Sequence, residues 1–415
     1  MKILAYIYVI LFSSSALGQL TLNSVNFYGE TRNKISYLKN YVLSEVGEPV
    51  TLKQLEADRK NLVNLPKYAH IHLKIDSFPM YVDATFELYE VQTITPVFDF
   101  GGIKENIYWQ LGVANSSALG FGLNYNMSYR NTDQRSNYFF NVKLPYIKGK
   151  PIGVEILVSR DATLEPVRLG EQSERYLYDR NNVALSGRYY FNPRNIFTLT
   201  GSYFTEGYNL KGENPLDFPS DFIHRKVLFA EEFSHNNENY FYYTVNGYSA
   251  YIKAVQVINL DQDFDFSLIQ AEGKYFAKLG SNGNLAMRLF AGISTNTDSP
   301  FAPFVLDSNV NIRGSGNRQE RGTSAVTLNV EHRQAVFEKG DIAVQLVGFV
   351  DAGIWRLPGR PWSLNDVNDD LRLFSGGGLR FIYKKFSRAV FRADYGIDIR
   401  AFEQQGFVLG VGQYF

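Results

Sequence analysis

The chain has 415 residues, and its 42 basic and 42 acidic side chains leave it formally neutral. A neutral balance gives no bulk electrostatic reason to bind nucleic acid, and no nucleic-acid partner is expected. The sequence contains no cysteine, which excludes disulfides, zinc–thiolate sites and a cysteine nucleophile. Tyrosine, phenylalanine and glycine are abundant, at 28, 32 and 34 residues. β-rich proteins with aromatic belts have such compositions, and so do some large secreted enzymes.

Residues 1–18 have the form of a secretory signal peptide. Lys2 precedes an apolar run of about ten residues, and Ala16 and Gly18 supply small side chains at the cleavage-recognition positions. Cleavage is expected before Gln19, because an uncleaved anchor helix needs about twenty apolar residues. No other apolar run approaches that length, which excludes a helical membrane protein. A β-barrel stays open, since its strands need only about 9–11 residues of alternating polarity.

Residues 19–92 are expected to form one small α+β domain. The stretch TLNSVNFYG alternates in polarity and predicts a strand. The stretch TRNKISYLKNYVLSEVG predicts a helix, and a second helix is expected to begin after the N-cap candidate Thr51. The apolar residues expected on one face of these helices are Ile35, Leu38, Val42, Leu43, Leu52, Leu55, Leu62 and Leu65. AHIHLKID and MYVDATFELYEV predict two further strands, so the order is β-α-α-β-β, with helices covering one face of a sheet.

From residue 93 onward the pattern changes to long alternating strands. In FRADYGIDIR, for example, apolar residues alternate with Arg392, Asp394 and Asp398. A soluble sandwich would bury the apolar face against a second sheet. Here the sequence predicts no helices to cover a sheet, and long polar loops separate the strands. A closed barrel with an apolar outer face and a polar lumen fits this pattern better.

About sixteen strands are expected, an even number, as in bacterial single-chain barrels. We place them at residues 94–100, 106–114, 119–130, 136–146, 151–161, 181–191, 195–208, 225–236, 245–258, 264–279, 284–296, 323–336, 340–354, 372–384, 388–399 and 405–415. The last strand, FVLGVGQYF, is expected to pair with the first and so to remove the sheet edges. The predicted fold is an all-β transmembrane barrel over residues 93–415, preceded by the small α+β domain.

The segment NIRGSGNRQERG, residues 311–322, interrupts these strands with glycines and arginines. In the next strand Val326, Leu328 and Val330 are expected to face outward, so the residues between and after them face the lumen. Those lumen-facing residues are Asn329, Glu331 and Arg333, and the same alternation places Gln345 and Asp351 in the lumen.

If the loop 300–322 folds inward, it brings Arg313 to the carboxylates of Glu331 and Asp351. A guanidinium pairs bidentately with a carboxylate, which fixes geometry as well as charge. Gly314 and Gly316 would allow a tight backbone turn beside the barrel wall. On these residues alone the alternative stays open, namely a solvated surface loop whose arginines contact nothing or contact lipopolysaccharide.

These motifs together resemble those of the BamA/TamA family of outer-membrane assembly proteins. NIRGSGNR is similar to the family's arginine-glycine loop motif, and SGGGLRF and FRADYG resemble its last-strand motifs. LNVEHR matches the Asn-x-Glu-x-Arg pattern, GFVDAGIW matches the Phe-x-Asp-x-Gly pattern, and residues 20–92 resemble its polypeptide-transport-associated (POTRA) domain. The family has an aromatic residue after Arg-Gly where this chain has Ser315, and an apolar residue two before the end where it has Gln413.

The resemblance implies a lock that seats the loop, with Arg313 and Gly314 on Asp351 and with Glu331 nearby. Asn329, Arg333, Phe349 and Gly353 would support this lock. Arg318 and Arg321 are expected to remain solvated. The resemblance also implies a C-terminal insertion signal. It consists of Gly410 and an outward stripe of Phe407, Leu409, Val411 and Phe415.

The resemblance implies a Gram-negative outer-membrane protein with a surface-antigen-type barrel and a periplasmic N-terminal domain. Its expected function is to assemble, insert or translocate polypeptides, through a seam that Gly101, Gly102, Gly410 and Gly412 are expected to weaken. The expected partners are unfolded outer-membrane or secreted polypeptides and outer-membrane lipids, with periplasmic chaperones or accessory lipoproteins as further candidates. The alternatives are a secretion pore for an exoprotein and a passive outer-membrane channel.

The sequence carries no catalytic signature. It has no Gly-x-Ser-x-Gly, no His-Glu-x-x-His and no P-loop, and the Gly-x-Gly of the loop precedes no predicted helix. His70 and His72 share one face of a predicted strand, a pattern more typical of a half-exposed edge than of a metal site. The chain is therefore expected not to be an enzyme, and to need neither a metal nor another cofactor.

Overall fold

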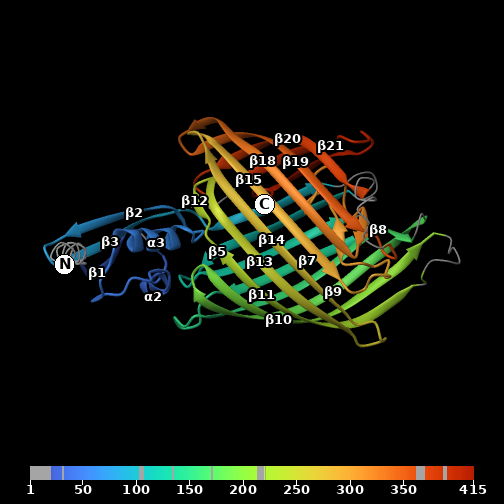
Figure 1. Cartoon of the computed structure of the whole chain (residues 1–415), viewed down its shortest axis with the longest axis horizontal. Coiled ribbons are helices and arrows are strands. Elements are labelled where there is room, and N and C mark those ends of the chain that lie inside the picture. The colour runs from blue at the N-terminus through green and yellow to red at the C-terminus, as the bar shows by residue number, and fades with distance from the viewer. Residues whose placement is uncertain are drawn as a thin grey trace, which may run out of the picture.

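A computed structural model describes residues 20–29, 32–101, 107–132, 135–169, 172–212, 219, 221–360, 370–386 and 390–415. The predicted signal peptide lies outside the described residues. A small N-terminal unit sits at one end of a large barrel (Figure 1). We call the barrel end next to this unit the proximal rim and the opposite end the distal rim. None of the helices in the described ranges is long and apolar enough to cross a membrane.

The N-terminal unit is a three-stranded sheet with helices on one face. β3 (Tyr81–Glu90) lies in the middle, parallel to β1 (Thr21–Tyr28) and antiparallel to β2 (Tyr68–Ser77). α3 (Leu52–Val63) begins at the predicted N-cap, where Thr51 and Gln54 bond each other's backbone N–H groups in a capping box. Leu55 and Leu62 of this helix are buried against the sheet.

The first helix of this unit is shorter than expected. It comprises α2 (Ile35–Leu38) and the single 3-10 turn η1 (Lys39–Tyr41), after which the chain is extended. The Asp58 carboxylate accepts hydrogen bonds from the N–H groups of Leu43 and Ser44, at 2.8 and 3.1 Å. These side-chain bonds replace the ones that a continued helix would make, so the helix ends early. The side chains expected on apolar helical faces but found exposed are Ile35, Leu43 and Leu52.

Within the described ranges, sixteen strands of seven residues or more close into an antiparallel barrel, which confirms the predicted fold and strand count. They are β4 (Ile94–Gly101), β5 (Tyr108–Ala118), β6 (Leu123–Thr132), β7 (Arg135–Leu144), β8 (Ile152–Leu169), β9 (Gln172–Asn192), β10 (Asn195–Lys211), β11 (Phe222–Asn236), β13 (Thr244–Asn259), β14 (Phe266–Leu279), β15 (Gly283–Ser294), β18 (Ser324–Lys339), β19 (Ile342–Arg356), β20 (Arg372–Tyr383), β21 (Val390–Asp398) and β22 (Gln405–Val411). The three-residue β12 (Asn239–Phe241) adds to the proximal end of β13.

Side chains alternate between the outer face and the lumen as the sequence predicts. In β18, Val326 and Leu328 are 37% and 39% exposed on the outer face, whereas Asn329 and Glu331 are fully buried inside. Leucine, phenylalanine and tyrosine side chains are exposed in the same way on the other strands. This is the surface that a barrel presents to lipid, around a polar interior.

β8 and β9 extend much further toward the distal rim than expected. The predicted polar connection 162–180 is instead a continuous strand pair, in register out to Leu169 and Gln172. Its lumen-facing Thr163, Glu165 and Tyr178 are buried by other parts of the chain rather than by lipid. The alternation of polar and apolar residues is therefore weak in the distal parts of β8 and β9, and sequence periodicity does not predict these parts as strands.

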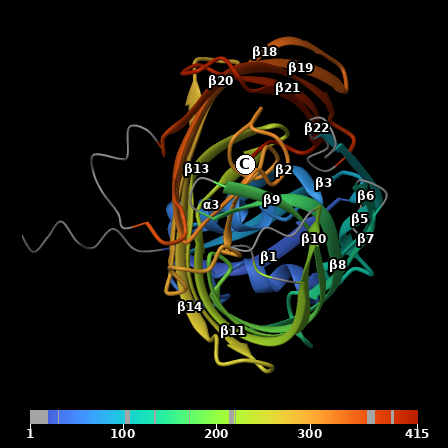
Figure 2. The same cartoon turned by 90° about the vertical axis from the view of Figure 1, so that its right-hand side faces the viewer.

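The N-terminal unit lies across the proximal rim and is hydrogen-bonded to it. The Lys34 N–H donates to the Gly120 carbonyl at 2.9 Å, and the Asn64 side chain donates to the Glu238 carbonyl at 2.6 Å. Arg194 donates to the side chain of Asn61 at 3.0 Å. Looking along the barrel, α3 and the sheet of this unit are seen behind the opening (Figure 2). The unit therefore contacts the proximal ends of β5, β6 and β9 to β13.

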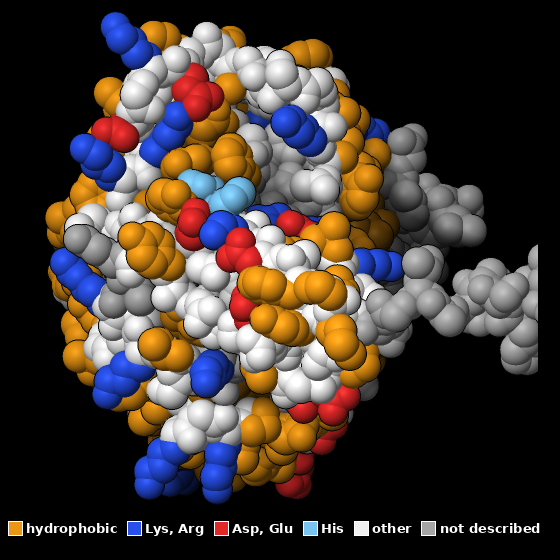
Figure 3. Space-filling model, turned by 90° about the vertical axis from the view of Figure 1, so that its left-hand side faces the viewer, with side chains coloured by type: hydrophobic (Ala, Val, Ile, Leu, Met, Phe, Trp, Pro, Cys, Tyr) orange, Lys and Arg blue, Asp and Glu red, His pale blue; other side chains and the backbone are white. Residues whose placement is uncertain are grey.

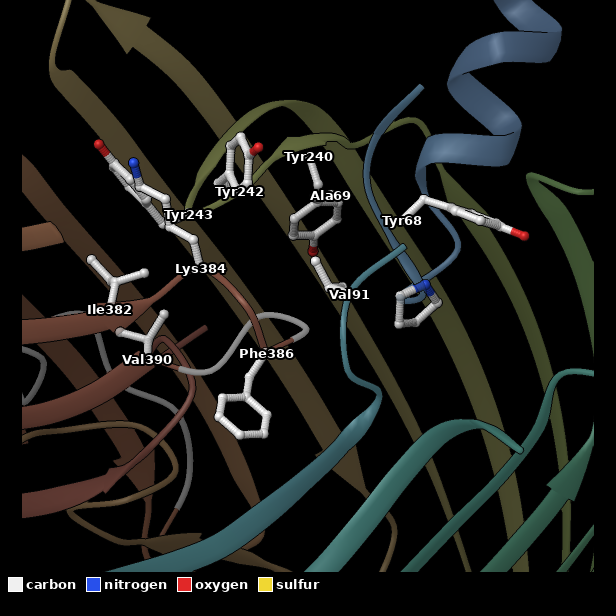
Figure 4. Close-up of a pocket in the computed structure, with 11 residues that line it drawn as sticks. Tyr68, Ala69, Val91, Tyr240, Tyr242, Tyr243, Ile382, Lys384, Phe386 and Val390 are labelled. Atoms are coloured by element: carbon white, nitrogen blue, oxygen red, sulfur yellow. The ribbon is translucent and has the colours of Figure 1, made fainter. Parts of the chain in front are cut away.

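A crevice remains where the unit meets β12 and the β20–β21 turn, lined by four tyrosines and by mostly aliphatic side chains (Figure 4). Its volume is about 20 Å³, which is room for about one water molecule. The crevice is therefore too small to hold a ligand and is a gap in the packing between the unit and the barrel. The face of the unit turned away from the barrel intermixes apolar, basic and acidic side chains (Figure 3).

Candidate functional site

The connection between β15 and β18, residues 295–323, folds back into the barrel, and we call it the lumen loop. It contains a short hairpin, β16 (Phe304–Leu306) with β17 (Glu320–Gly322). Phe304, Leu306 and Ile312 of this loop pack in one apolar cluster with residues of the β18, β19 and β20 wall. The loop crosses the inside of the ring of strands (Figure 2).

Arg313, at the inner end of this loop, is fully buried and bonded to two carboxylates. Its Nε and Nη2 donate to Asp351 of β19 at 2.8 and 2.9 Å, and its backbone N–H donates to the same side chain at 3.0 Å. Its Nη1 donates to Glu331 of β18 at 2.6 Å. The guanidinium fork thus meets Asp351 bidentately, the strongest geometry for such a pair.

Two aromatic rings lie against the same guanidinium. The ring of Phe349 is 3.6 Å from the Arg313 Cζ, and the ring of Tyr414 is 4.2 Å from it. Both rings are buried. Cation–π contacts of this kind are strongest when the cation is removed from water, as it is here. Sequence reasoning placed Phe349 in this motif, but it missed Tyr414.

The charges around Arg313 balance within a fully buried group. Asn329 donates to Asp351 at 2.8 Å, and Arg333 donates to Glu331 at 2.5 Å. Arg380 binds Asp394 through two bonds of 2.6 and 3.1 Å, and Asp394 lies 3.8 Å from Arg313. The six charged side chains are Arg313, Arg333, Arg380, Glu331, Asp351 and Asp394, and all are fully buried. Three positive and three negative charges suit a site without water, where an unpaired charge is costly.

Glycines allow the loop to approach the wall closely. Gly314 has φ +92°, a conformation that favours glycine, and its Cα faces Gly396 of β21. A Cβ on either glycine would come within 3.0 Å of the other segment's backbone. Gly353 is also tightly placed, because a Cβ there would meet the ring of Trp355.

The lumen loop has a second anchor on the opposite wall. Arg318 forms salt bridges with Asp161 and, at 3.4 Å, with Glu165. Arg321 binds Glu165 at 2.8 Å. The expectation that these two arginines remain solvated is wrong. β8, which carries both carboxylates, continues far enough toward the distal rim to meet the loop.

Replacing Glu165 by glutamine is expected to destabilise the barrel by about 3 kcal/mol, because Arg321 then loses its carboxylate in a buried site. Glu165 is only 1% exposed. The measurement is the free energy of unfolding in denaturant, together with the rate at which a protease cuts the lumen loop. Asp161→Asn is the matched control, with an expected loss below about 1 kcal/mol because the Asp161 side chain is 38% exposed. Equal losses for the two variants would contradict Glu165 as the main anchor.

The join between β22 and β4 is the weakest pairing of the barrel. In the described part of the chain it contains two residue pairs, Leu409 with Phe100 and Gly410 with Asp99. Every other neighbouring pair among the sixteen strands has seven or more. Gly410 faces inward beside Arg392 and Asp99, and a Cβ there would lie 3.1 to 3.3 Å from their side chains. Gly102, expected to weaken this seam, lies outside the described residues.

The expected outward stripe at the end of the chain is only partly found. Phe407 is 61% exposed on the outer face, and Leu409 and Val411 follow it at alternate positions of β22. Phe415 does not share this stripe. β22 ends at Val411, Gly412 adopts φ +98°, and the chain then turns into the lumen. There Phe415 packs with Val245, Phe276 and Ala286, and the C label lies inside the ring in Figure 2.

The histidines do not gather at a metal site. Among the described residues, no group of three or more histidine, aspartate or glutamate side chains is arranged to hold a metal ion. Burial lowers the pKa of the His70 imidazole, and His72 and Arg59 lower it further. His70 stacks on Tyr89 at 4.1 Å, which gives it an ordinary place on the sheet surface.

No protein-family model matches the sequence, and no curated protein sequence matches it. The fold is similar to that of BamA from Haemophilus ducreyi lacking POTRA domains 1–3, at 14% identity and a TM-score of 0.54, covering 94% of this chain and 84% of that one. It is similar to that of CdiB from Acinetobacter baumannii, at 15% identity and a TM-score of 0.60, covering 95% of this chain and 74% of that one. It is also similar to that of CdiB from Escherichia coli, at 14% identity and a TM-score of 0.64, covering 95% of this chain and 76% of that one. At these identities the likeness is one of fold.

Proposed function

We propose that this chain is an outer-membrane protein-transport barrel that inserts polypeptides into the membrane through the seam between β22 and β4. The seam itself carries the proposal, since two residue pairs hold it in the described part of the chain. Unpaired backbone groups cost several kcal/mol each in lipid, so a barrel opens most easily where the fewest pairs break. The two freed edges then offer backbone partners to an incoming strand.

The N-terminal unit supports the same function from its position. In this proposal it is a POTRA-like domain in the periplasm, and the barrel spans the outer membrane of a Gram-negative cell with its apolar face on lipid. In the described sheet β2 is an edge strand that pairs with β3 alone. An unfolded polypeptide can add to such an edge by main-chain hydrogen bonds, which demand no particular sequence. The motifs shared with the BamA/TamA family and the fold shared with BamA and CdiB support this assignment.

The proposed activity breaks no covalent bond, so the protein is not an enzyme in this proposal. Folding of the client into lipid supplies the free energy, and neither a nucleotide nor a metal takes part. The residues that matter are then those that hold the lumen loop and those that hold the seam.

The test is a reversible disulfide across the seam. Because the natural chain has no cysteine, Phe100→Cys and Leu409→Cys form the one disulfide available to the molecule. With an unfolded barrel client and liposomes, we expect the oxidised variant to lose client insertion almost completely and to regain it on reduction. The matched control carries Leu328→Cys and Ala352→Cys, which face each other on β18 and β19. Its disulfide is expected to leave insertion unchanged.

Full insertion by the oxidised seam variant would exclude the seam route. The alternative of a secretion pore is favoured by the lumen loop, which lies across the barrel interior as a removable plug would. In that case a secreted polypeptide passes through the lumen whether or not the seam is closed. If the protein shows neither insertion nor secretion, and ion conductance rises on Arg313→Ala, the protein is a passive channel.

A further inference from the structure

The segment Gly412–Phe415, which we call the terminal segment, joins the seam strand to the site that holds the lumen loop. It continues directly from β22, whose other side faces β4 across the weak join. After the turn at Gly412 it enters the lumen, away from β4. The contacts that hold this segment inside the lumen therefore also restrain β22, one of the two strands of the seam.

Tyr414 is the centre of this connection. Its ring lies 4.2 Å from the Arg313 Cζ, and its hydroxyl donates to the Ser308 carbonyl at 2.9 Å. The Ser308 hydroxyl in turn accepts the Gly314 N–H at 2.8 Å. One side chain of the terminal segment thus touches the lumen loop on both sides of its inner turn. Tyr414 is 8% exposed, so water hardly competes for these contacts.

The residues on either side of Tyr414 are held by the barrel wall. The Gln413 side chain accepts from Arg380 at 3.1 Å and donates to Gln345 at 3.3 Å. Arg392 donates to the Gln413 carbonyl at 3.2 Å, and Arg333 donates to a backbone oxygen of Phe415 at 3.2 Å. Arg333 and Arg380 belong to the buried charged group around Arg313. The terminal segment is therefore part of the lock, although it belongs to the seam strand.

We propose that Tyr414 is a positioning residue that couples the lumen loop to the seam, so that β22 separates from β4 only after Tyr414 leaves Arg313. The two residue pairs of the seam are too few to keep it closed by themselves, and the terminal segment supplies the missing restraint. Release of the loop then releases the seam. This inference rests on the proposed function, because it concerns the same seam, but its test needs no client.

The test measures seam opening directly. Spin labels on Phe98→Cys and Phe407→Cys lie on the outer faces of β4 and β22, away from the terminal segment. Their distance distribution is measured by pulsed electron resonance in liposomes. We expect Tyr414→Ala to raise the wide-distance fraction roughly tenfold, because a desolvated cation–π contact and a hydrogen bond are lost together. Arg313→Ala is expected to do the same, and the double variant is expected to add little to either.

Two further variants separate coupling from loss of packing. Tyr414→Phe keeps the ring on Arg313 but loses the bond to Ser308, so we expect an intermediate wide fraction. Tyr208→Ala removes another fully buried lumen tyrosine, which touches Phe301 and lies 5.6 Å from Arg321 at the opposite anchor of the loop. It does not touch the terminal segment, and we expect the seam distribution to stay as in the wild type.

A wild-type distribution in Tyr414→Ala would overturn the proposal, and so would equal widening in Tyr208→Ala. Additive widening in the double variant would overturn it as well, because independent effects are not coupled. If Tyr414→Ala does not fold, Tyr414→Leu fills a similar volume without a ring, and the same outcomes apply. A coupled seam in a protein that inserts no client would refute the proposed function and leave this inference intact.

Discussion

Replacing Arg313 by alanine is expected to free the lumen loop and to lower the free energy of unfolding by about 3–5 kcal/mol. The substitution removes one partner of a fully buried network and leaves Asp351 and Glu331 facing each other without their shared cation. The stability is measured by denaturant unfolding in detergent, and the state of the loop by ion conductance in a planar bilayer. We expect conductance to rise, because the loop is no longer held across the lumen.

Two controls make this result specific to the buried network. Arg313→Lys keeps a charge but loses the planar fork, so its stability is expected to lie between those of the wild type and Arg313→Ala. Arg225→Ala breaks a pair with Asp261 in which the arginine side chain is 60% exposed, and its expected loss is below about 1 kcal/mol. If Arg313→Ala changes neither stability nor conductance, the loop is not held by this lock.

Adding a single methyl group at Gly396 is expected to displace the same loop from the other side. The Cβ of Gly396→Ala would lie within 3.0 Å of the Arg313 carbonyl carbon and oxygen. These are backbone atoms, so no side-chain rotation can relieve the clash. We expect a destabilisation of about 1–3 kcal/mol, as for other overpacked sites. Cleavage of the loop by an added protease is expected to increase in parallel.

Gly348→Ala is the matched control, because Gly348 lies on β19 and a Cβ there meets nothing within 4 Å. We expect it to behave as the wild type. If Gly396→Ala acts by expelling Arg313, then combining it with Arg313→Ala is expected to cost much less than the sum of the two changes. Full additivity would mean that the methyl group damages the barrel wall rather than the seat of the loop.

The sequence predicts the barrel because lipid imposes a simple rule on it. Every lipid-facing strand alternates, so the sixteen strands and the inward direction of Glu331 and Asp351 follow from side-chain polarity. The first helix of the N-terminal unit could not be predicted to the same extent, since Asp58 ends it from another helix. Local periodicity carries no information about such a partner.

The parts of the candidate site that were missed depend on contacts between distant segments. Arg318 and Arg321 meet carboxylates on β8 that are more than 150 positions away in the sequence. Phe415 was expected to continue the outward stripe of the last strand, and the turn at Gly412 sends it into the lumen instead. The contact of Tyr414 with Arg313 was not predicted, because it joins two segments about a hundred residues apart. Ser315 is buried and bonded to the Ile312 carbonyl at 2.7 Å. This small residue supplies no ring to Arg313, and the rings that lie against it come from Phe349 and Tyr414.

The N-terminal unit is hydrogen-bonded to proximal turns on both sides of the seam. Lys34, Asn61 and Asn64 tie this unit to the turns that end β5, β9 and β11, and β4 follows it directly in the chain. On the other side of the seam, the Gln92 N–H donates to the Lys385 carbonyl in the β20–β21 turn at 2.9 Å. The seam between β22 and β4 lies between these two sets of contacts. In the proposed opening, β4 is held by the N-terminal unit that precedes it in the chain, and β22 is the strand that moves once the terminal segment is released.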